Sequence, residues 1–377
     1  MDKLFEDTIR DYDGPSDHNE NKYNFYSRSS RDDVAIVRDK LNKWFSEFPN
    51  EEKKEMKKRF QKDFDSSFYE LFLYHLFSQL GFKIEIHPKV PNSKKRPDFL
   101  VSKKDLEFYI EAKVVTGKSK DQAAFERKRN EFFDSLNKLK FDRFLIGIDE
   151  LDFIKDIQPS PKKIIKYLQQ EIDKLDADDL TKRINSGELL HLPKIEFEDE
   201  NFYALISVFP LIEEASLEKH KRPIGIYPCD VFWGAGEENL RKAINEKGKR
   251  YGALDKPFLL CINTLDSKTS GALDIENAIW GSLALSWSND PSNKNEKWIR
   301  KLNGVFFNSK SARIKDVSGI MITKALPFNT KNNNYWIFEH PFCTNKIDFQ
   351  KLNLTYYYEE NDQIKKQEGK KLNDIID

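Results

Sequence analysis

The amino-acid sequence predicts an α/β fold with a mixed central sheet, flanking helices, an N-terminal helical segment and a C-terminal α/β extension. Residues 106–113 alternate apolar and polar side chains with a period of two, which is typical of a strand. Residues 66–77 place apolar side chains at helical spacing, and residues 202–211 and 258–263 are apolar runs of strand length. Helical and strand patterns therefore alternate along the chain, as they do in α/β proteins.

We expect three segments along the 377 residues. Residues 1–60 begin with a polar, partly flexible stretch and continue as a helix from Val34 to about Gln61. Residues 61–215 form the core. Residues 216–377 form a further α/β region, which could complete the core sheet, recognise the substrate or form an oligomer. The patterns along the chain do not choose between these three roles.

The core is expected to open with a helix that carries Glu70, followed by a strand near residues 81–87 and by two further strands. A helix from about Asp121 to Leu139 comes next, and the apolar run at residues 144–148 is the expected fourth strand of the core sheet. Glu70 has apolar residues three, four and seven positions ahead of it on its helix. Because a buried carboxylate is costly unless it is paired or bound to a metal, Glu70 is a candidate site residue.

The second and third strands of this core carry two short motifs. Pro97-Asp98 opens one strand, and Glu111-Ala112-Lys113 closes the other, with Glu111 thirteen positions after Asp98. Strand alternation places Glu111 and Lys113 on one polar face, where Asp98 of the neighbouring strand can join them. Carboxylate oxygens are the ligands that Mg²⁺ prefers, and an ammonium group can orient a water molecule or offset the charge of a phosphate. The grouping is therefore suited to metal-assisted hydrolysis of a phosphodiester.

This arrangement resembles the PD-(D/E)XK nuclease superfamily, whose members share a restriction-endonuclease-like core. The resemblance covers less than a third of the chain. It implies that Asp98, Glu111 and the main-chain carbonyl of Ala112 bind Mg²⁺, for which Mn²⁺ can substitute. It also implies that Glu70 binds a second metal or its water, and that Lys113 orients the attacking water. The implied function is that of a bacterial restriction or defence endonuclease, which hydrolyses DNA to 5′-phosphate and 3′-hydroxyl ends.

A second interpretation uses some of the same residues. Residues 112–119 fit a relaxed phosphate-binding loop of a P-loop NTPase, with Ala112 in place of the first glycine and Lys118 as the phosphate-binding lysine. Residues 144–150 would then be the strand that ends in metal-binding acids. However, the strand before the loop carries Glu111, whereas a strand inside a parallel sheet should be apolar on both faces. The nuclease interpretation is favoured, with the NTPase as its alternative.

Two plainer interpretations are also open. Charged residues make up 33% of the chain, so Glu-x-Lys can arise by chance on a solvated edge strand. The chain could also be a nucleic-acid-binding module on a catalytically inactive nuclease fold, although the intact set of Asp98, Glu111 and Lys113 argues against this. The helix predicted at residues 237–251 carries a row of cations that either contacts phosphates or faces solvent: Lys242, Lys247, Lys249 and Arg250.

Composition limits the remaining possibilities. The net charge is zero, yet residues 94–140 hold 13 lysines and arginines against 8 acids, an excess suited to DNA as a partner. The mean hydropathy is −0.71 and no apolar run is long enough to span a membrane, so no membrane association is expected. The N-terminus lacks the pattern of a signal peptide, and the three cysteines are too widely spaced for a zinc site or a disulfide framework. We therefore expect a cytoplasmic protein, and the sequence leaves open whether it forms a homo-oligomer.

Overall fold

The computed structural model describes residues 3–91, 93–212, 222–228, 234, 236–269, 271–290, 292, 295–306 and 313–376. The chain forms two compact units. Unit 1 comprises Met1–Arg10, Asp32–Gly117 and Trp233–Asp377, and unit 2 comprises Asp11–Arg31 and Lys118–Phe232. Most of unit 2 is therefore inserted into the sequence of unit 1 directly after Gly117, and the two units cross the expected segment boundaries at residues 60 and 215.

Unit 1 is built around a mixed sheet whose strand order, within the described residues, is β1-β2-β3-β8-β11-β12-β13-β14. β3 pairs antiparallel with β2 and parallel with β8, and β8 pairs parallel with β11. A separate hairpin is formed by β9 and β10. The strands are β1 (Lys83–Ile86), β2 (Phe99–Lys103), β3 (Leu106–Val115), β8 (Phe258–Thr264), β9 (Leu283–Ser286), β10 (Lys297–Arg300), β11 (Gly319–Thr323), β12 (Tyr335–Glu339), β13 (Tyr356–Glu360) and β14 (Gln363–Gln367).

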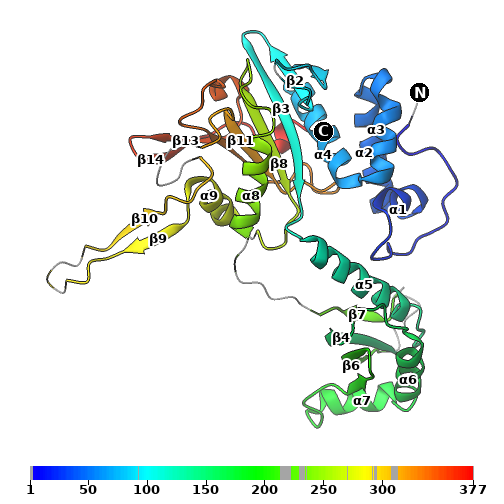
Figure 1. Cartoon of the computed structure of the whole chain (residues 1–377). Helices are drawn as coiled ribbons and strands as arrows, with labels where there is room; N and C mark the ends of the chain where they lie inside the picture. The colour runs from blue at the N-terminus through cyan, green and yellow to red at the C-terminus, as the bar shows by residue number, and fades with distance from the viewer. Residues whose placement is uncertain are drawn as a thin grey trace. The chain divides into compact units, whose positions relative to one another are not determined.

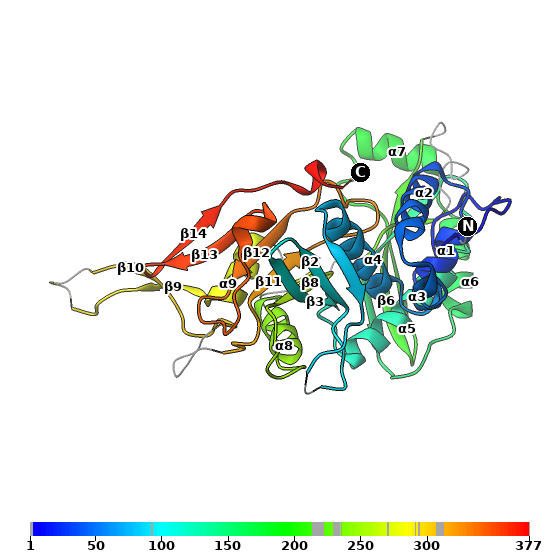
Figure 2. The same ribbon diagram turned by 90° about the horizontal axis from the view of Figure 1, so that it is seen from above.

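Helices cover both faces of this sheet, as Figures 1 and 2 show. On one face, the ring of Phe77 from α4 meets the ring of Phe108 from β3 edge to face, with centroids 5.9 Å apart. On the other face, Leu240 and Ile244 from α8 share a buried core with Tyr109. Because neighbouring residues of a strand point to opposite faces, β3 is covered on both sides. The helices of unit 1 are α2 (Asp32–Glu47), α3 (Asn50–Lys62), α4 (Phe64–Gln79), α8 (Gly236–Gly248) and α9 (Ala272–Trp280), with short 3₁₀ turns at Phe349–Leu352 and Leu372–Asp374.

The helix predicted from Val34 to Gln61 is interrupted. α2 ends at Glu47 and α3 begins at Asn50. Pro49 lies between them, and proline both lacks an N–H group and disfavours the helical conformation of the residue before it. The prediction of one continuous helix was therefore wrong at this position.

Unit 2 has its own mixed sheet, with the strand order β5-β6-β4-β7. Its buried core brings Phe132 and Leu136 from α5 together with Ile146 from β4 and Val208 from β6. The elements of this unit are α1 (Lys22–Arg28), α5 (Lys120–Leu136), β4 (Phe144–Phe153), α6 (Lys162–Ile172), α7 (Ala177–Asn185), β5 (Lys194–Glu198), β6 (Phe202–Pro210) and β7 (Ile224–Ile226).

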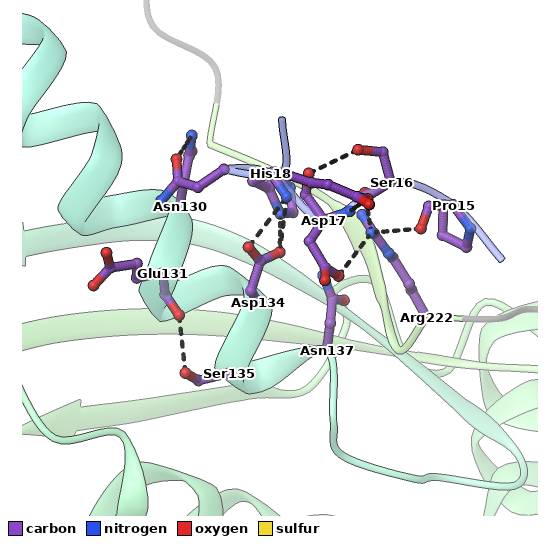
Figure 3. Close-up of polar contacts among 12 residues, drawn as sticks. Pro15, Ser16, Asp17, His18, Asn130, Glu131, Asp134, Ser135, Asn137 and Arg222 are labelled. Carbon is purple, nitrogen blue, oxygen red and sulfur yellow. Dashed lines mark hydrogen bonds and ion pairs between the residues drawn. The ribbon is translucent and has the colours of Figure 1, made fainter. Parts of the chain in front are cut away.

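Polar contacts hold residues 11–31 to the rest of unit 2 (Figure 3). His18 Nδ1 lies 2.5 Å from Oδ1 of Asp134, and the backbone N–H of His18 donates to both oxygens of the same carboxylate. The guanidinium of Arg222 donates to the carbonyls of Pro15 and Ser16. These contacts explain why a segment early in the chain belongs to this unit.

The α/β class is confirmed, but the fourth strand of the core sheet is not the predicted one. The run at residues 144–148 lies in β4, which pairs with β6 and β7 in unit 2. The neighbour of β3 is β8, which is buried at all seven of its positions. A strand apolar on both faces is suited to the centre of a sheet, between β3 and β11, and strands from residues 216–377 thus complete the sheet of unit 1. The helix predicted at 121–139 is α5, and it also belongs to unit 2.

None of the described helices is long and apolar enough to cross a membrane.

Candidate active site

The site residues predicted from the sequence line one cavity of about 220 Å³ in unit 1. The helix α4 contributes one of them, the residue before β2 contributes the second, and β3 contributes the rest. The cavity therefore lies where β2 begins and β3 runs on beyond it. The predicted residues that line it are Glu70, Asp98, Glu111, Ala112 and Lys113.

The strand register places Asp98 beside Glu111. Phe99 of β2 pairs with Ile110 of β3 in antiparallel fashion, so the next pair along the ladder is Asp98 with Glu111. Directly opposite residues of such a pair have Cβ atoms about 4.5–5.5 Å apart, which puts the two carboxyl groups within reach of one another. The structure thus brings together two acids that the sequence separates by thirteen positions.

The same register accounts for the position of Ala112. Its backbone N–H donates to Oδ2 of Asp98 across 2.7 Å. The N–H and C=O groups of one strand residue point to the same side, so the carbonyl of Ala112 also faces the edge where β2 begins. The residue opposite Ala112 in the extended register is Pro97, and proline has no N–H to donate to that carbonyl. The carbonyl is therefore placed to serve as a ligand.

Glu111 is more enclosed than the sequence indicated. Its side chain is 3% exposed, because α8 covers the face of β3 that was expected to be polar. Lys247 Nζ donates to Oε1 of Glu111 at 2.5 Å, and a guanidinium nitrogen of Arg250 lies 3.4 Å from the same oxygen. The hydroxyl of Tyr251 donates to Oε2. Both oxygens of this buried carboxylate therefore have protein partners.

Asp98 and Glu70 occupy an environment that disfavours their charged forms. Burial raises the pKa of Asp98 well above its usual range, and the nearby carboxylates of Glu70 and Glu111 raise it further. Burial also raises the pKa of Glu70, against the opposing effect of the Arg59 guanidinium that pairs with it. Burial and the repulsion between neighbouring acids therefore disfavour the charged forms of Asp98 and Glu70, and a bound cation would offset that repulsion.

The donor set fits a hard divalent cation, since three carboxylates and a carbonyl supply only oxygen. Among the described residues, however, no three Asp, Glu, His or Cys side chains are already arranged around one metal position. The contacts of the acids account for this, because Glu111 faces Lys247 and Tyr251, while Glu70 faces Arg59. Metal binding at this site would therefore require these side chains to exchange partners.

Lys113 lies where strand alternation predicts. It is two residues after Glu111 on β3, it is half-buried, and it lines the cavity. An ammonium group on the same face as the two acids can hold a water molecule or a phosphate oxygen.

Sequence reasoning missed Arg59 and Tyr251 as partners of the acids. For Lys247 and Arg250 it left open whether they contact phosphate or face solvent. The signal was present in part, because Arg250 and Tyr251 lie three and four positions after Lys247, which is the spacing of neighbours on one side of a helix. Nothing local indicated that this side would meet Glu111.

The residues of the NTPase interpretation have a different arrangement. Ala112 to Val115 continue β3, and a loop of four residues leads to α5, whose N-cap is Ser119. The carboxylate of Asp266 lies against Gly117, and Lys118 pairs with Glu126. A phosphate placed at Gly117 would meet a carboxylate, which is unfavourable.

No family model, curated protein or solved structure matches the chain.

Proposed function

We propose that the protein is a metal-dependent nuclease that hydrolyses phosphodiester bonds in DNA. The observation that carries the proposal is the pairing of Asp98 with Glu111 across β2 and β3, with the carbonyl of Ala112 and the side chain of Lys113 beside them. Glu70 reaches the same cavity from α4. This is the set of groups that the sequence motifs predicted for such chemistry.

The order of elements in unit 1 supports the same proposal. A helix, α4, precedes the three antiparallel strands β1, β2 and β3, and after unit 2 the chain returns with α8 and β8, which is parallel to β3. This order resembles a restriction-endonuclease-like core, with unit 2 inserted between its third strand and the following helix. In this comparison, β8 occupies the position in the sheet that was predicted for residues 144–148.

Asp98, Glu111 and the carbonyl of Ala112 would hold Mg²⁺ or Mn²⁺, with Glu70 on a second metal or its water. A metal ion bound there would supply an activated water and would offset the charge of the phosphate. Lys113 would orient that water or hold a phosphate oxygen. Ala112, through its N–H, keeps the carboxylate of Asp98 in place for this role.

DNA is the proposed partner, and a bacterial restriction or defence endonuclease acting in the cytoplasm is the proposed biological type. Arg96, which lines the cavity directly before Pro97, would contact the DNA backbone close to the reacting phosphate. Lys94 and Lys95 extend the positive charge on the same loop. Such contacts contribute to affinity without reading sequence.

The proposal is tested by incubating plasmid DNA and single-stranded DNA with the protein and Mg²⁺, with and without EDTA. We expect cleavage by the wild-type protein that EDTA abolishes, and a loss of at least about 100-fold in Asp98→Asn, since even a partner of a metal ligand is worth 10- to 100-fold. Asp105→Asn is the matched control, because Asp105 lies in the turn between β2 and β3 and pairs with Lys351 at the surface.

Three results would count against the proposal. Equal cleavage by Asp98→Asn and the wild type would show that this site does not carry out the cleavage. Binding of DNA without cleavage would favour an inactive nuclease fold that binds nucleic acid. Hydrolysis of ATP in place of DNA would favour the P-loop alternative.

A further inference from the structure

One cation from α8 pairs directly with Glu111, one of the proposed metal ligands. Lys247 Nζ donates to Oε1 of Glu111 at 2.5 Å, and its side chain is only 14% exposed. Lysine is a compact point charge on a flexible stem, and it is rarely buried unless it is paired. Its position therefore depends on the carboxylate that it meets.

This contact is specific to one side of the helix. Lys242 and Lys249 belong to the same basic row, yet both are exposed and neither lines the cavity. Lys247 lies in the last turn of α8, where the helix dipole favours a cation, and Lys249 lies one residue beyond the end of the helix. Only Lys247 is buried against an acid of the candidate site, so the helix dipole does not account for its placement.

We propose that Lys247 is the resident counter-ion of Glu111, that it competes with the metal for this carboxylate, and that it binds the substrate phosphate once the metal has displaced it. The inference rests on the proposed nuclease function and adds a substrate-binding residue to that site. Sequence motifs did not assign this role.

The competition follows from the geometry. An ammonium group 2.5 Å from Oε1 occupies the position that a cation would take on that oxygen, and two cations cannot share it without strong repulsion. Tyr251 holds the other oxygen of Glu111 and Arg250 approaches Oε1 at 3.4 Å, so Lys247 is the nearest obstacle to a metal on Oε1. Removal of its charge should make the carboxylate a better metal ligand.

The proposed binding of phosphate follows from the position of Lys247 after a metal has displaced it from Glu111. It lines the cavity together with Lys113, so the displaced ammonium stays beside the reacting groups. A phosphate placed between these lysines would replace the carboxylate as the counter-charge of Lys247. The same residue would therefore weaken metal binding in the free protein and strengthen substrate binding in the loaded one.

The test measures Mn²⁺ binding by calorimetry without DNA, and then the binding of a short duplex in Ca²⁺. The proteins are the wild type, Lys247→Met, Lys247→Gln and Lys247→Arg, with Lys242→Met as the control on the same helix. We expect Lys247→Met and Lys247→Gln to bind Mn²⁺ at least about tenfold more tightly than the wild type and the duplex at least about threefold more weakly, where tenfold corresponds to about 1.4 kcal/mol. Lys247→Arg and Lys242→Met should match the wild type in Mn²⁺ affinity.

A purely structural role for Lys247 gives the opposite result, since a damaged site binds metal more weakly. Lys247→Gln keeps a donor for Glu111 and guards against loss of folding in Lys247→Met. Unchanged or weaker Mn²⁺ binding in a folded Lys247→Gln protein would overturn the inference and leave the nuclease proposal in place. Absence of Mn²⁺ binding in the wild type, with Glu111→Gln indistinguishable from it, would overturn both.

Discussion

The backbone N–H of Ala112 donates to Oδ2 of Asp98 across 2.7 Å, and so a main-chain group of β3 holds a carboxylate that precedes β2. The contact orients Asp98, but it does not overcome burial and the two neighbouring acids, which together raise the pKa of Asp98. The arrangement of the site therefore costs free energy, because it holds its acids close enough to repel one another.

This relationship predicts the effect of Asp98→Asn on stability. The amide oxygen of asparagine can still accept the Ala112 N–H, while the charge that repels Glu70 and Glu111 is gone. Without metal, the melting temperature should hold or rise by a few degrees. With excess Mn²⁺ the wild type should gain stability by ligand binding and the variant should not. A fall of more than about 3 °C in the metal-free variant, which for a domain of the size of unit 1 is about 1 kcal/mol, would contradict the repulsive cluster.

The two lysines that follow Glu111 separate the nuclease and NTPase interpretations. Lys113→Met should reduce DNA cleavage by at least about 100-fold, the scale seen when a positioned group that stabilises developing charge is removed. Lys118→Met should leave cleavage nearly unchanged, because Lys118 pairs with Glu126 at the surface and does not line the cavity. Loss of activity in Lys118→Met with Lys113→Met unaffected would reverse the assignment.

Gly117 predicts a stability effect at the junction of the two units. Its φ is +68°, and a Cβ atom added there would come within 2.0 Å of Oδ2 of Asp266, which is buried. Gly252 has a φ of +69° with open space around the added atom, so it is the matched control. In urea denaturation, Gly252→Ala should lose about 1 kcal/mol through the backbone alone, and Gly117→Ala at least about 2 kcal/mol more. Equal losses would mean that the loop moves away from Asp266 at little cost.

His340 predicts a dependence of stability on pH. Its Nε2 donates to the carbonyl of Arg313 and its Nδ1 accepts from the N–H of Phe342, so the neutral ring satisfies both partners. Burial lowers the pKa of His340 from 6.5 to about 4. As the pH falls below 6.5, the unfolded chain binds a proton that the folded chain does not bind. The free energy of unfolding therefore decreases between pH 6.5 and 4.

The measurement is the free energy of unfolding from pH 7.5 to 4.5 in the wild type and in His340→Gln. The wild type should lose up to about 1.4 kcal/mol per pH unit more than the variant over this range, the limit for one proton. Parallel pH profiles would show that His340 is not the titrating group.

Local patterns predicted the site better than its surroundings. The alternation of β3 was sufficient to place Glu111 and Lys113 on one face, because strand periodicity depends only on neighbouring residues. The burial of that face was not predictable, since the helix that covers it follows the whole insertion. The pairing of Glu70 with Arg59 likewise depends on how α3 packs against α4, which neither helix encodes alone.

The fourth strand illustrates the same limit. β4 and β8 are both apolar runs of suitable length, and strands close in sequence are neighbours more often than distant ones. That preference favoured residues 144–148. The apolar residues of β6 pair with β4 along its length, and this pairing places β4 in the sheet of unit 2. The local sequence of β4 does not show which distant strand it will pair with.

The insertion of unit 2 also sets an order for synthesis on the ribosome. β3 emerges before residues 118–232, and its parallel neighbour β8 emerges after them. Until then the edge of β3 from Tyr109 to Val115 lacks its partner, and an unpaired strand edge is open to pairing with another chain. If the insertion folds while β8 is still being made, it holds the intervening chain in a compact form and reduces the entropy that must be lost when β8 reaches β3. Early folding of the insertion would thus shorten the interval in which a growing chain is vulnerable to aggregation.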